Sequence, residues 1–214
     1  MGDYMTHHLS NFENDVLKEI GNIGVGNAAT SMSNLMNKNI TMNIPYVHLL
    51  TINEIMEIVG GPEEIIVTTF CKMKGDISGT VYFVLSMEEA SLIAKQMLQD
   101  ETVEITIVED MNDMVTSALR EVANIVIGSY ISALADFTNM QIQTTIPFLS
   151  VDMAAATLVT GLLEFSRESD HAILIGSKFF GEEMVEQAKS HFLLVPDLDS
   201  IPELFKALGV TDYD

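Results

Sequence analysis

Hydrophobic residues recur at helical spacing close to the N-terminus of the chain. They are Phe12, Val16, Ile20 and Ile23. A repeat every three or four positions places side chains on one side of an α-helix, so the pattern predicts a long helix over about 10–37 with this apolar stripe buried. Three glycines in the same stretch, Gly21, Gly24 and Gly26, each lower helix stability by about 1 kcal/mol relative to alanine. We expect another backbone to approach the helix closely there.

Shorter patterns predict one series of helices and strands in the first half of the chain. A strand is expected to end at Pro45, which has no N–H to donate to a ladder. Thr51 is a candidate N-cap for a short helix, and Ser86 for a longer one. The expected elements are a helix over 10–37, a strand over 40–44, a helix over 52–59, a hairpin of strands over 65–73 and 80–85, and a helix over 87–98.

The second half is expected to repeat this series with looser spacing. Asp152 is a candidate N-cap for a helix whose first turns hold Ala154, Ala155 and Ala156, and Gly209 ends the last helix. The expected elements are a helix from about 106 or 110 to 137, a strand over 141–146, a helix over 152–166, strands over 171–179 and 191–195, and a helix over 200–208. Each half reads α-β-α-β-β-α. We expect a single α/β domain over 1–214, with helices on both sides of one mostly antiparallel sheet.

The chain contains an internal repeat, with copies over about 10–99 and about 106–209. The stretch over 15–45, DVLKEIGNIGVGNAATSMSNLMNKNITMNIP, aligns without a gap on 117–147, SALREVANIVIGSYISALADFTNMQIQTTIP. The identical pairs include Glu19 and Glu121, Asn22 and Asn124, Ile23 and Ile125, Gly26 and Gly128, Asn37 and Asn139, Ile40 and Ile142, Ile44 and Ile146, and Pro45 and Pro147. Chance would not keep a Glu, an Asn and a Pro in register over this span. We interpret the repeat as a duplication that gives two halves related by a pseudo-two-fold axis.

A polar stripe lies beside the apolar stripe of the first predicted helix. It consists of Asp15, Glu19 and Asn22 in the first copy, and of Ser117, Glu121 and Asn124 in the second. The spacing i, i+4, i+7 places the three side chains on one side of a helix. Such a stripe is usually only a solvated face. Asn is a poor helix former, however, and it is kept in both copies while Asp15 is replaced by Ser117. We therefore take the Glu and Asn pairs as candidate functional residues.

The motif resembles the signature of the CheC, CheX and FliY phosphatases of chemotaxis. In that family an Asp or Ser is followed after three residues by Glu, after two more by Asn, and after twenty-two more by Pro. Both copies match it, as Asp15, Glu19, Asn22 and Pro45 and as Ser117, Glu121, Asn124 and Pro147. Two intact copies in 214 residues, without an additional flagellar-switch domain, are most similar to the CheC branch. The resemblance implies a pseudo-symmetric three-layer α/β/α fold.

The resemblance also implies an activity, hydrolysis of the phospho-aspartate of the response regulator CheY. This acyl phosphate is already activated and is held with the receiver's own Mg²⁺, so the phosphatase needs chiefly to position a water in line with phosphorus. A carboxamide can accept from that water and donate to the phosphoryl group, the role we expect for Asn22 and Asn124. Glu19 and Glu121 would pair with the receiver's lysine. The supporting residues, expected to be architectural or orienting, are Asp15, Pro45, Ser117 and Pro147.

A regulatory binding module is the alternative function. Members of the family bind the receptor deamidase CheD, and the segment SVDMAAA over 150–156 lies where their CheD-docking helix would start. The candidate contacts with CheD are Asp152, Ala154 and Ala155. An N-cap role would explain Asp152 equally well. The two functions are compatible, whereas a purely structural flagellar-switch role is disfavoured because both motif copies are retained.

The composition excludes several classes of partner. The formal charge of −21, from 31 acidic and 10 basic residues, repels nucleic-acid phosphates and anionic lipids.

No apolar run approaches the roughly eighteen residues of a membrane span, and the N-terminus lacks the features of a signal peptide. Gly2 and Thr6 satisfy only a loose myristoylation pattern. The lone Cys71 has no partner for an internal disulfide, so we expect a buried thiol and a cytoplasmic protein.

The sequence offers no other chemistry of its own. No His cluster, Cys-based phosphate loop, Walker pattern or two-metal carboxylate set is found in it. The glycine-rich GNIGVGN over 21–27 lies inside a predicted helix with no strand before it, which disfavours a nucleotide site. His7 and His8 are adjacent, so their side chains would diverge on a helix and are not expected to bind a metal. We expect a phosphatase with no metal or cofactor of its own.

Overall fold

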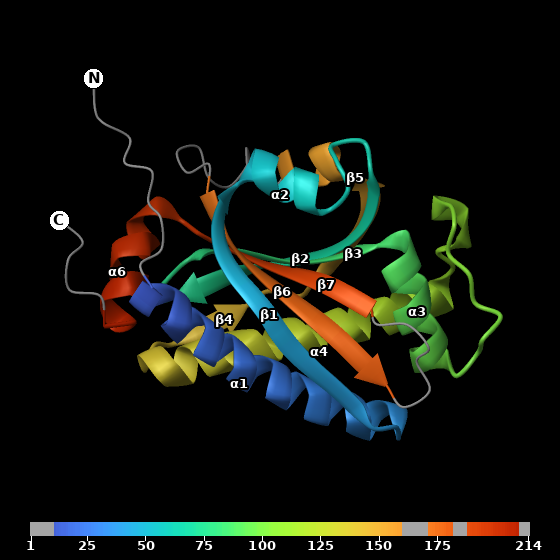
Figure 1. Cartoon of the computed structure of the whole chain (residues 1–214), viewed down its shortest axis with the longest axis horizontal. Helices are drawn as coiled ribbons and strands as arrows, with labels where there is room; N and C mark the ends of the chain where they lie inside the picture. The colour runs from blue at the N-terminus through green and yellow to red at the C-terminus, as the bar shows by residue number, and fades with distance from the viewer. Residues whose placement is uncertain (1–10, 160–170, 182–187, 210–214) are drawn as a thin grey trace.

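The computed structural model describes residues 11–159, 171–181 and 188–209 (Figure 1). The first half contains α1 (Asn11–Met36), β1 (Ile40–Thr51), α2 (Ile52–Ile58), β2 (Ile65–Gly75), β3 (Gly79–Ser86) and α3 (Met87–Leu98). The second half contains the short 3-10 helix η1 (Val108–Asp110), α4 (Asp113–Thr138), β4 (Ile142–Thr144), β5 (Phe148–Met153), the π-helical turn η2 (Ala155–Val159), β6 (His171–Gly181), β7 (Ala188–Pro196), η3 (Leu198–Ser200) and α6 (Ile201–Ala207).

Capping residues begin the short helices where the sequence predicts them. The hydroxyl of Thr51 accepts from the backbone N–H of Glu54, and the Glu54 carboxylate accepts from the N–H of Thr51. Ser86 and Glu89 form the same pair of hydrogen bonds at the start of α3. Each capping box satisfies backbone donors that the first helical turn leaves without partners. The predictions for α2 and α3 are confirmed.

One antiparallel sheet separates two layers of helices. Its strand order is β1-β6-β7-β3-β2-β4, and β5 also pairs with β2. The larger core lies between the sheet and a helical layer that includes α1, α3, α4 and α6, and the smaller core lies beneath α2 and η2. Figure 1 shows α1 and α4 on one side of the sheet and α2 on the other. The predicted three-layer α/β/α fold is confirmed.

The strand order reads the same from either edge of the sheet when corresponding strands of the repeat are matched. β1 then corresponds to β4 and β5, β2 to β6, and β3 to β7. The first strand of each half pairs with the second strand of the other half, and the two third strands meet at the centre. A two-fold axis between β3 and β7 would generate this order. Duplication of an ancestral half stays our interpretation of the repeat.

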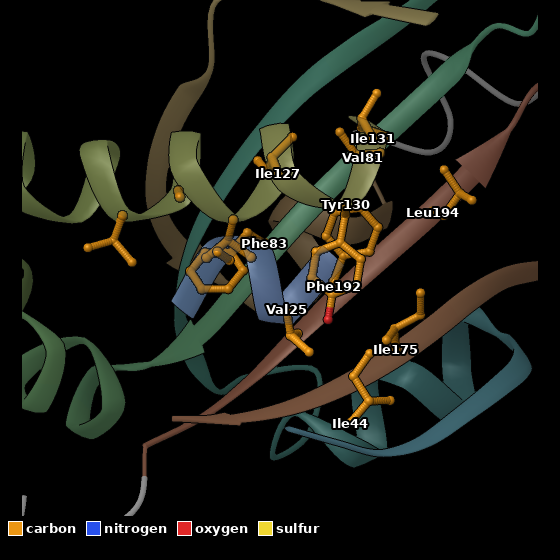
Figure 2. Close-up of a cluster of buried hydrophobic side chains, with 14 of the residues drawn as sticks. Val25, Ile44, Val81, Phe83, Ile127, Tyr130, Ile131, Ile175, Phe192 and Leu194 are labelled. Atoms are coloured by element: carbon orange, nitrogen blue, oxygen red, sulfur yellow. The ribbon is translucent and has the colours of Figure 1, made fainter. Parts of the chain in front are cut away.

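The two long helices lie side by side and run in opposite directions (Figure 1). A Cβ on Gly24 of α1 would lie 3.1 Å from the Cα of Tyr130 in α4, and a Cβ on Gly21 would clash with the side chain of Ile44. The Tyr130 ring in turn stacks on Phe192 of β7, with ring centroids 4.3 Å apart (Figure 2). The expectation that another backbone approaches closely is therefore confirmed at Gly24, whereas the close neighbours at Gly21 are side chains. It is wrong at Gly26, where a Cβ would meet nothing within 4 Å.

The buried side of α1 differs from the predicted apolar stripe. Phe12 and Ile23 are 57% and 43% exposed, and of the stripe only Ile20 is fully buried. The helix faces both α4 and β1, so its buried side is wider and includes small residues that a hydrophobic pattern does not weigh. Its buried residues are Glu13, Leu17, Ile20, Gly21, Gly24, Val25, Ala28, Ala29, Met32 and Met36.

Each long helix ends at an asparagine in the left-handed conformation. Asn37 has a φ of 52° and Asn139 a φ of 54°. The next N–H donates back over the end of the helix, from Lys38 to the carbonyl of Ser33 and from Met140 to that of Ala135. Asn is one of the few residues with a side chain that adopt a positive φ readily, and after Gly it is the usual residue at such a helix end. The repeat therefore keeps this asparagine to turn the chain from the helix into the following strand.

The proline of the repeat marks a β-bulge, so the prediction that a strand ends at Pro45 is wrong. β1 continues to Thr51, and two residues between Asn43 and Tyr46 lie opposite one residue of β6. Around Pro147 three residues between β4 and β5 likewise lie opposite two of β2, so the strand predicted over 141–146 is split. Proline is tolerated at a bulge because the extra residue leaves the ladder there.

The helix predicted over 152–166 begins later than predicted, and its described part is helical only from Ala154 on. Asp152 lies in β5 opposite Ile66 of β2, and helical structure begins only after it, at Ala154 and in η2. An oxygen of its carboxylate accepts from the next N–H, of Met153, so it does not cap a helix. The backbone groups along this edge of β2 need hydrogen-bond partners, and β5 supplies them by pairing as a strand. Residues 160–166 lie outside the described residues.

The start of the second long helix lies later than either predicted position. The side-chain oxygen of Asn112 caps α4 by accepting from the N–H groups of Met114 and Val115. Asp110 instead accepts from the N–H groups of Thr106 and Ile107, which lowers the pKa of its carboxyl. This acidic residue therefore closes the turn before α4.

The left-handed asparagine gives a test of the fold. Replacing Asn139 with Val should lower the free energy of unfolding by about 1–2 kcal/mol, because a β-branched side chain is strained at positive φ. Asn139→Gly, which removes the strain, serves as the matched control and should leave stability nearly unchanged or raise it. Urea denaturation followed by circular dichroism gives both values. Equal stability of the Val and Gly variants would contradict the assigned backbone conformation.

His191 in β7 gives a pH-dependent test. Its ring nitrogen Nδ1 lies 3.3 Å from the hydroxyl of Tyr46. Burial, and secondarily the positive charge of Lys189, lower the pKa of His191 to about 4. The unfolded chain, with the ordinary histidine pKa, binds the proton first as pH falls, so His191 reduces stability between about pH 6.5 and 4. From pH 7 to 5 this loss should reach at most about 2 kcal/mol.

Urea denaturation at pH 7 and pH 5 tests this loss against His191→Gln, whose side chain does not titrate. The wild type should lose more stability than the variant over this interval. Equal losses would show that His191 is not the group whose protonation destabilises the fold.

Candidate functional site

The polar stripe on α1 faces solvent as predicted. Asp15, Glu19 and Asn22 are all exposed, and so is Pro45 at the bulge of β1. The opposite sides of the helix are occupied by α4 and β1, which leaves this stripe uncovered. Glu19 and Asn22 therefore present a carboxylate and a carboxamide about one turn apart.

In the second copy a cavity of about 410 Å³ lies between α4 and the segment that joins β4 to β5. Arg120, Glu121, Asn124, Thr144, Thr145, Ile146 and Pro147 line it. The structure thus brings three of the predicted residues together around one cavity, namely Glu121, Asn124 and Pro147. Ser117 is exposed one turn earlier on α4 and is not among the lining residues.

Four lining residues were not predicted as site residues. Thr144, Thr145 and Ile146 come directly before the motif proline, Pro147. They line the cavity because the segment between β4 and β5 lies beside α4. Arg120 places a guanidinium next to the Glu and Asn pair, one turn of helix before Asn124. The repeat held a signal for Arg120, since Lys18 occupies the corresponding position and keeps a positive charge there in a chain with only 10 basic residues.

The groups around the cavity suit positioning rather than covalent or metal chemistry. A carboxamide offers two donors and an acceptor, a carboxylate accepts, and a guanidinium donates. Cys71 is buried within β2, and burial raises its pKa to about 11, so it has no thiolate to offer as a nucleophile. Within 11–159, 171–181 and 188–209 no three His, Cys, Asp or Glu side chains are gathered as metal ligands. Independence from a cofactor of its own stays a prediction.

The segment predicted to contact CheD lies at the far end of β5, away from the cavity. Asp152 is exposed, Ala155 is half-buried against the smaller core, and Ala154 is fully buried. The N–H groups of Ala154 and Ala155 donate to the carbonyls of Glu64 and Pro62, which ties this segment to the turn before β2. Among the three candidates, Asp152 alone presents a fully exposed side chain to a partner.

In the described part of the chain, α4 is the one helix long and apolar enough to meet the length and composition of a membrane span. Its most apolar stretch is 56% buried in the fold. Those buried side chains pack against α1, α3 and the sheet. This is the behaviour of a core helix, for which the same composition is usual.

Two family models match the chain. The model described as the CheC-like family matches residues 12–49, and the one described as chemotaxis phosphatase CheX matches residues 67–170. The CheY-P phosphatase CheC of Bacillus subtilis (strain 168) is 35% identical over 199 residues, which cover 92% of this chain and 94% of that protein. The flagellar motor switch phosphatase FliY of the same organism is 25% identical over 139 residues, covering 65% of this chain and 35% of that protein.

Solved structures share the fold at lower sequence identity. Thermotoga maritima FliY superposes with a TM-score of 0.75 at 18% identity and covers 94% of this chain and 98% of its own. A chain of the FliG-FliM complex from H. pylori gives a TM-score of 0.68 at 14% identity and covers 92% of this chain and 100% of its own. Identity over nearly the full length of the Bacillus phosphatase, with both copies of the motif retained, shows that the chain belongs to the CheC family of chemotaxis phosphatases.

Proposed function

We propose that this protein is a CheY-P phosphatase that hydrolyses the phospho-aspartate of a CheY-type receiver domain at two pseudo-equivalent sites. The observation that carries the proposal is the cavity beside α4, where Glu121, Asn124 and Pro147 of the motif lie together. The Bacillus relative, which this chain matches over 94% of its length, is named as a phosphatase of CheY-P. The matching stripe on α1 is exposed in the same way and provides the second candidate site.

Asn22 and Asn124 each position the attacking water. The carboxamide oxygen accepts a hydrogen bond from the water, while its N–H₂ group donates to a phosphoryl oxygen. Water oxygen bonds to phosphorus as the bond from phosphorus to the aspartyl oxygen breaks. The products are inorganic phosphate, which takes the proton, and the free aspartate. Ordering the water accounts for the acceleration because positioning dominates phosphoryl transfer.

Glu19 and Glu121 hold the receiver in register. Each carboxylate is exposed about one turn from its Asn, so it can form a charge-assisted hydrogen bond with the receiver's lysine. The Mg²⁺ in this reaction belongs to the phosphorylated receiver, the substrate. The phosphatase contributes no metal, and we place it in the cytoplasm with that substrate.

A second role, binding of the deamidase CheD, is compatible with this activity. Asp152 supports it as an exposed carboxylate on strand β5 that is not among the residues lining the cavity. In that case the protein is a regulator whose catalysis is weak. The decay assay below separates the two roles, since sequestration of CheD requires no hydrolysis.

The decay of a phosphorylated CheY-type receiver tests the phosphatase proposal. Wild-type protein should accelerate the loss of phosphate, and Asn22→Ala and Asn124→Ala should each remove the contribution of one site. The double variant should lose nearly all of the acceleration, roughly a hundredfold, because the water is no longer ordered. Asn34→Ala, at an exposed position of α1 away from the motif, should match the wild type.

The fold of the variants is checked in parallel. Asn22 and Asn124 are exposed and Ala is the better helix former, so neither substitution should lower the thermal midpoint. A double variant that is folded and as active as the wild type would refute the role of the asparagines. A wild type that binds CheD but leaves the receiver phosphate intact would favour the regulatory module.

A further inference from the structure

The two copies of the motif differ at the isoleucine before the proline. Ile44 is 5% exposed and lies in the larger core, whereas Ile146 is 90% exposed. Both residues lie at a one-residue bulge, but Ile44 is part of the continuous strand β1, whereas Ile146 lies in the break between β4 and β5. The residue that each isoleucine meets on the neighbouring helix differs as well.

Position 21 and its counterpart 123 supply that difference. Gly21 has no Cβ, and the terminal Cδ1 of Ile44 lies where a Cβ on Gly21 would be (Figure 2 shows Ile44 beside Ile175 in the core). In the second copy this glycine is replaced by Ala123, which is 1% exposed and so fills its place with a methyl group. Two carbon atoms do not share one space, so Ile146 has no equivalent pocket and turns to solvent.

The exposed isoleucine is placed where a substrate protein must arrive. Ile146 lines the same cavity as Glu121 and Asn124. Phe148, two residues further along, packs on Phe70 on the side of the sheet that α2 covers and is not among the residues that line the cavity. An isolated exposed isoleucine needs no explanation. One that lines a polar cavity offers apolar contact area to a protein that docks there.

We propose that Ile146 is a receiver-contact residue of the second site alone and strengthens its binding of the phosphorylated receiver relative to the first site. The inference rests on the proposed phosphatase function and names a specificity difference within it. Burying this side chain under the receiver removes its apolar surface from water, whereas Ile44 has already buried its own within the fold. The alanine at position 123 is the positioning residue that keeps Ile146 outside.

Receiver decay measured as a function of receiver concentration tests the proposal with the first site silenced by Asn22→Ala. In that background Ile146→Ala should raise KM for the phosphorylated receiver about tenfold and leave kcat nearly unchanged, because the contact acts in binding. The matched control is Ile58→Ala on α2, an isoleucine 41% exposed on the other side of the sheet, and it should change neither constant.

Two further variants exchange the helix residues without touching the isoleucines. Ala123→Gly in the Asn22→Ala background should let Ile146 fold inward and raise KM as the truncation does. Gly21→Ala in the Asn124→Ala background should expel Ile44 and lower KM of the first site. Circular dichroism of each variant checks that the chain is folded. If the Gly21→Ala protein does not fold, the Ala123→Gly protein still tests the proposal.

The outcomes separate this inference from the proposed function. If the Asn22→Ala protein is active and neither Ile146→Ala nor Ala123→Gly changes its KM, the receiver does not contact Ile146 and the inference is wrong while the phosphatase function stands. The inference is also wrong if the second site alone proves inactive. If the wild type fails to accelerate receiver decay, the proposed function fails and the inference fails with it.

Discussion

The contact between α1 and α4 is the interaction on which the rest of the structure depends. Gly24 lets the backbone of α1 approach Tyr130 of α4, and the Tyr130 ring stacks on Phe192 of the sheet. Each helix therefore buries one side against its partner and another against strands. The remaining side faces solvent, and the Glu and Asn pairs occupy that side in both copies. Packing of the helix pair thus orients both candidate sites.

A second constraint brings a strand to each of these helices. The left-handed asparagine at the helix end turns the chain back, and the bulge at the Ile-Pro pair bends the strand beside the helix it has just left. Both devices fall at corresponding positions of the repeat. They explain why a proline far from the Glu and Asn pair in sequence belongs to the same motif, since it lines the cavity with Asn124.

Locally determined features could be predicted from the sequence, and features that need a distant partner could not. The helix over 87–98 was predicted with its observed bounds because Ser86 and Glu89 cap it from within. Asp152 was assigned to a helix because nothing in its neighbours reveals the open edge of β2. The buried side of α1 was misjudged for the same reason, since glycine and alanine there pack against α4.

The residues of the candidate site also fall into those that local sequence predicts and those that depend on distant partners. The exposed stripes follow from helical periodicity, which requires no tertiary information. The residues that β4 and the bulge add to the cavity depend on strand pairing with β2, and the burial of Ile44 and exposure of Ile146 depend on neighbours outside the motif. Identical motif residues in the two copies therefore lie in different surroundings.

The central claim is that the two motif faces are the surfaces that receive the phosphorylated substrate. The crystal structure of this protein with a receiver domain activated by beryllofluoride, a phosphoryl mimic, tests it most directly. Our account predicts the mimic within hydrogen-bonding distance of the Asn124 carboxamide, the receiver's lysine beside Glu121, and Ile146 covered by the receiver. A receiver bound elsewhere, with Asn22 and Asn124 both left open to solvent, would contradict it.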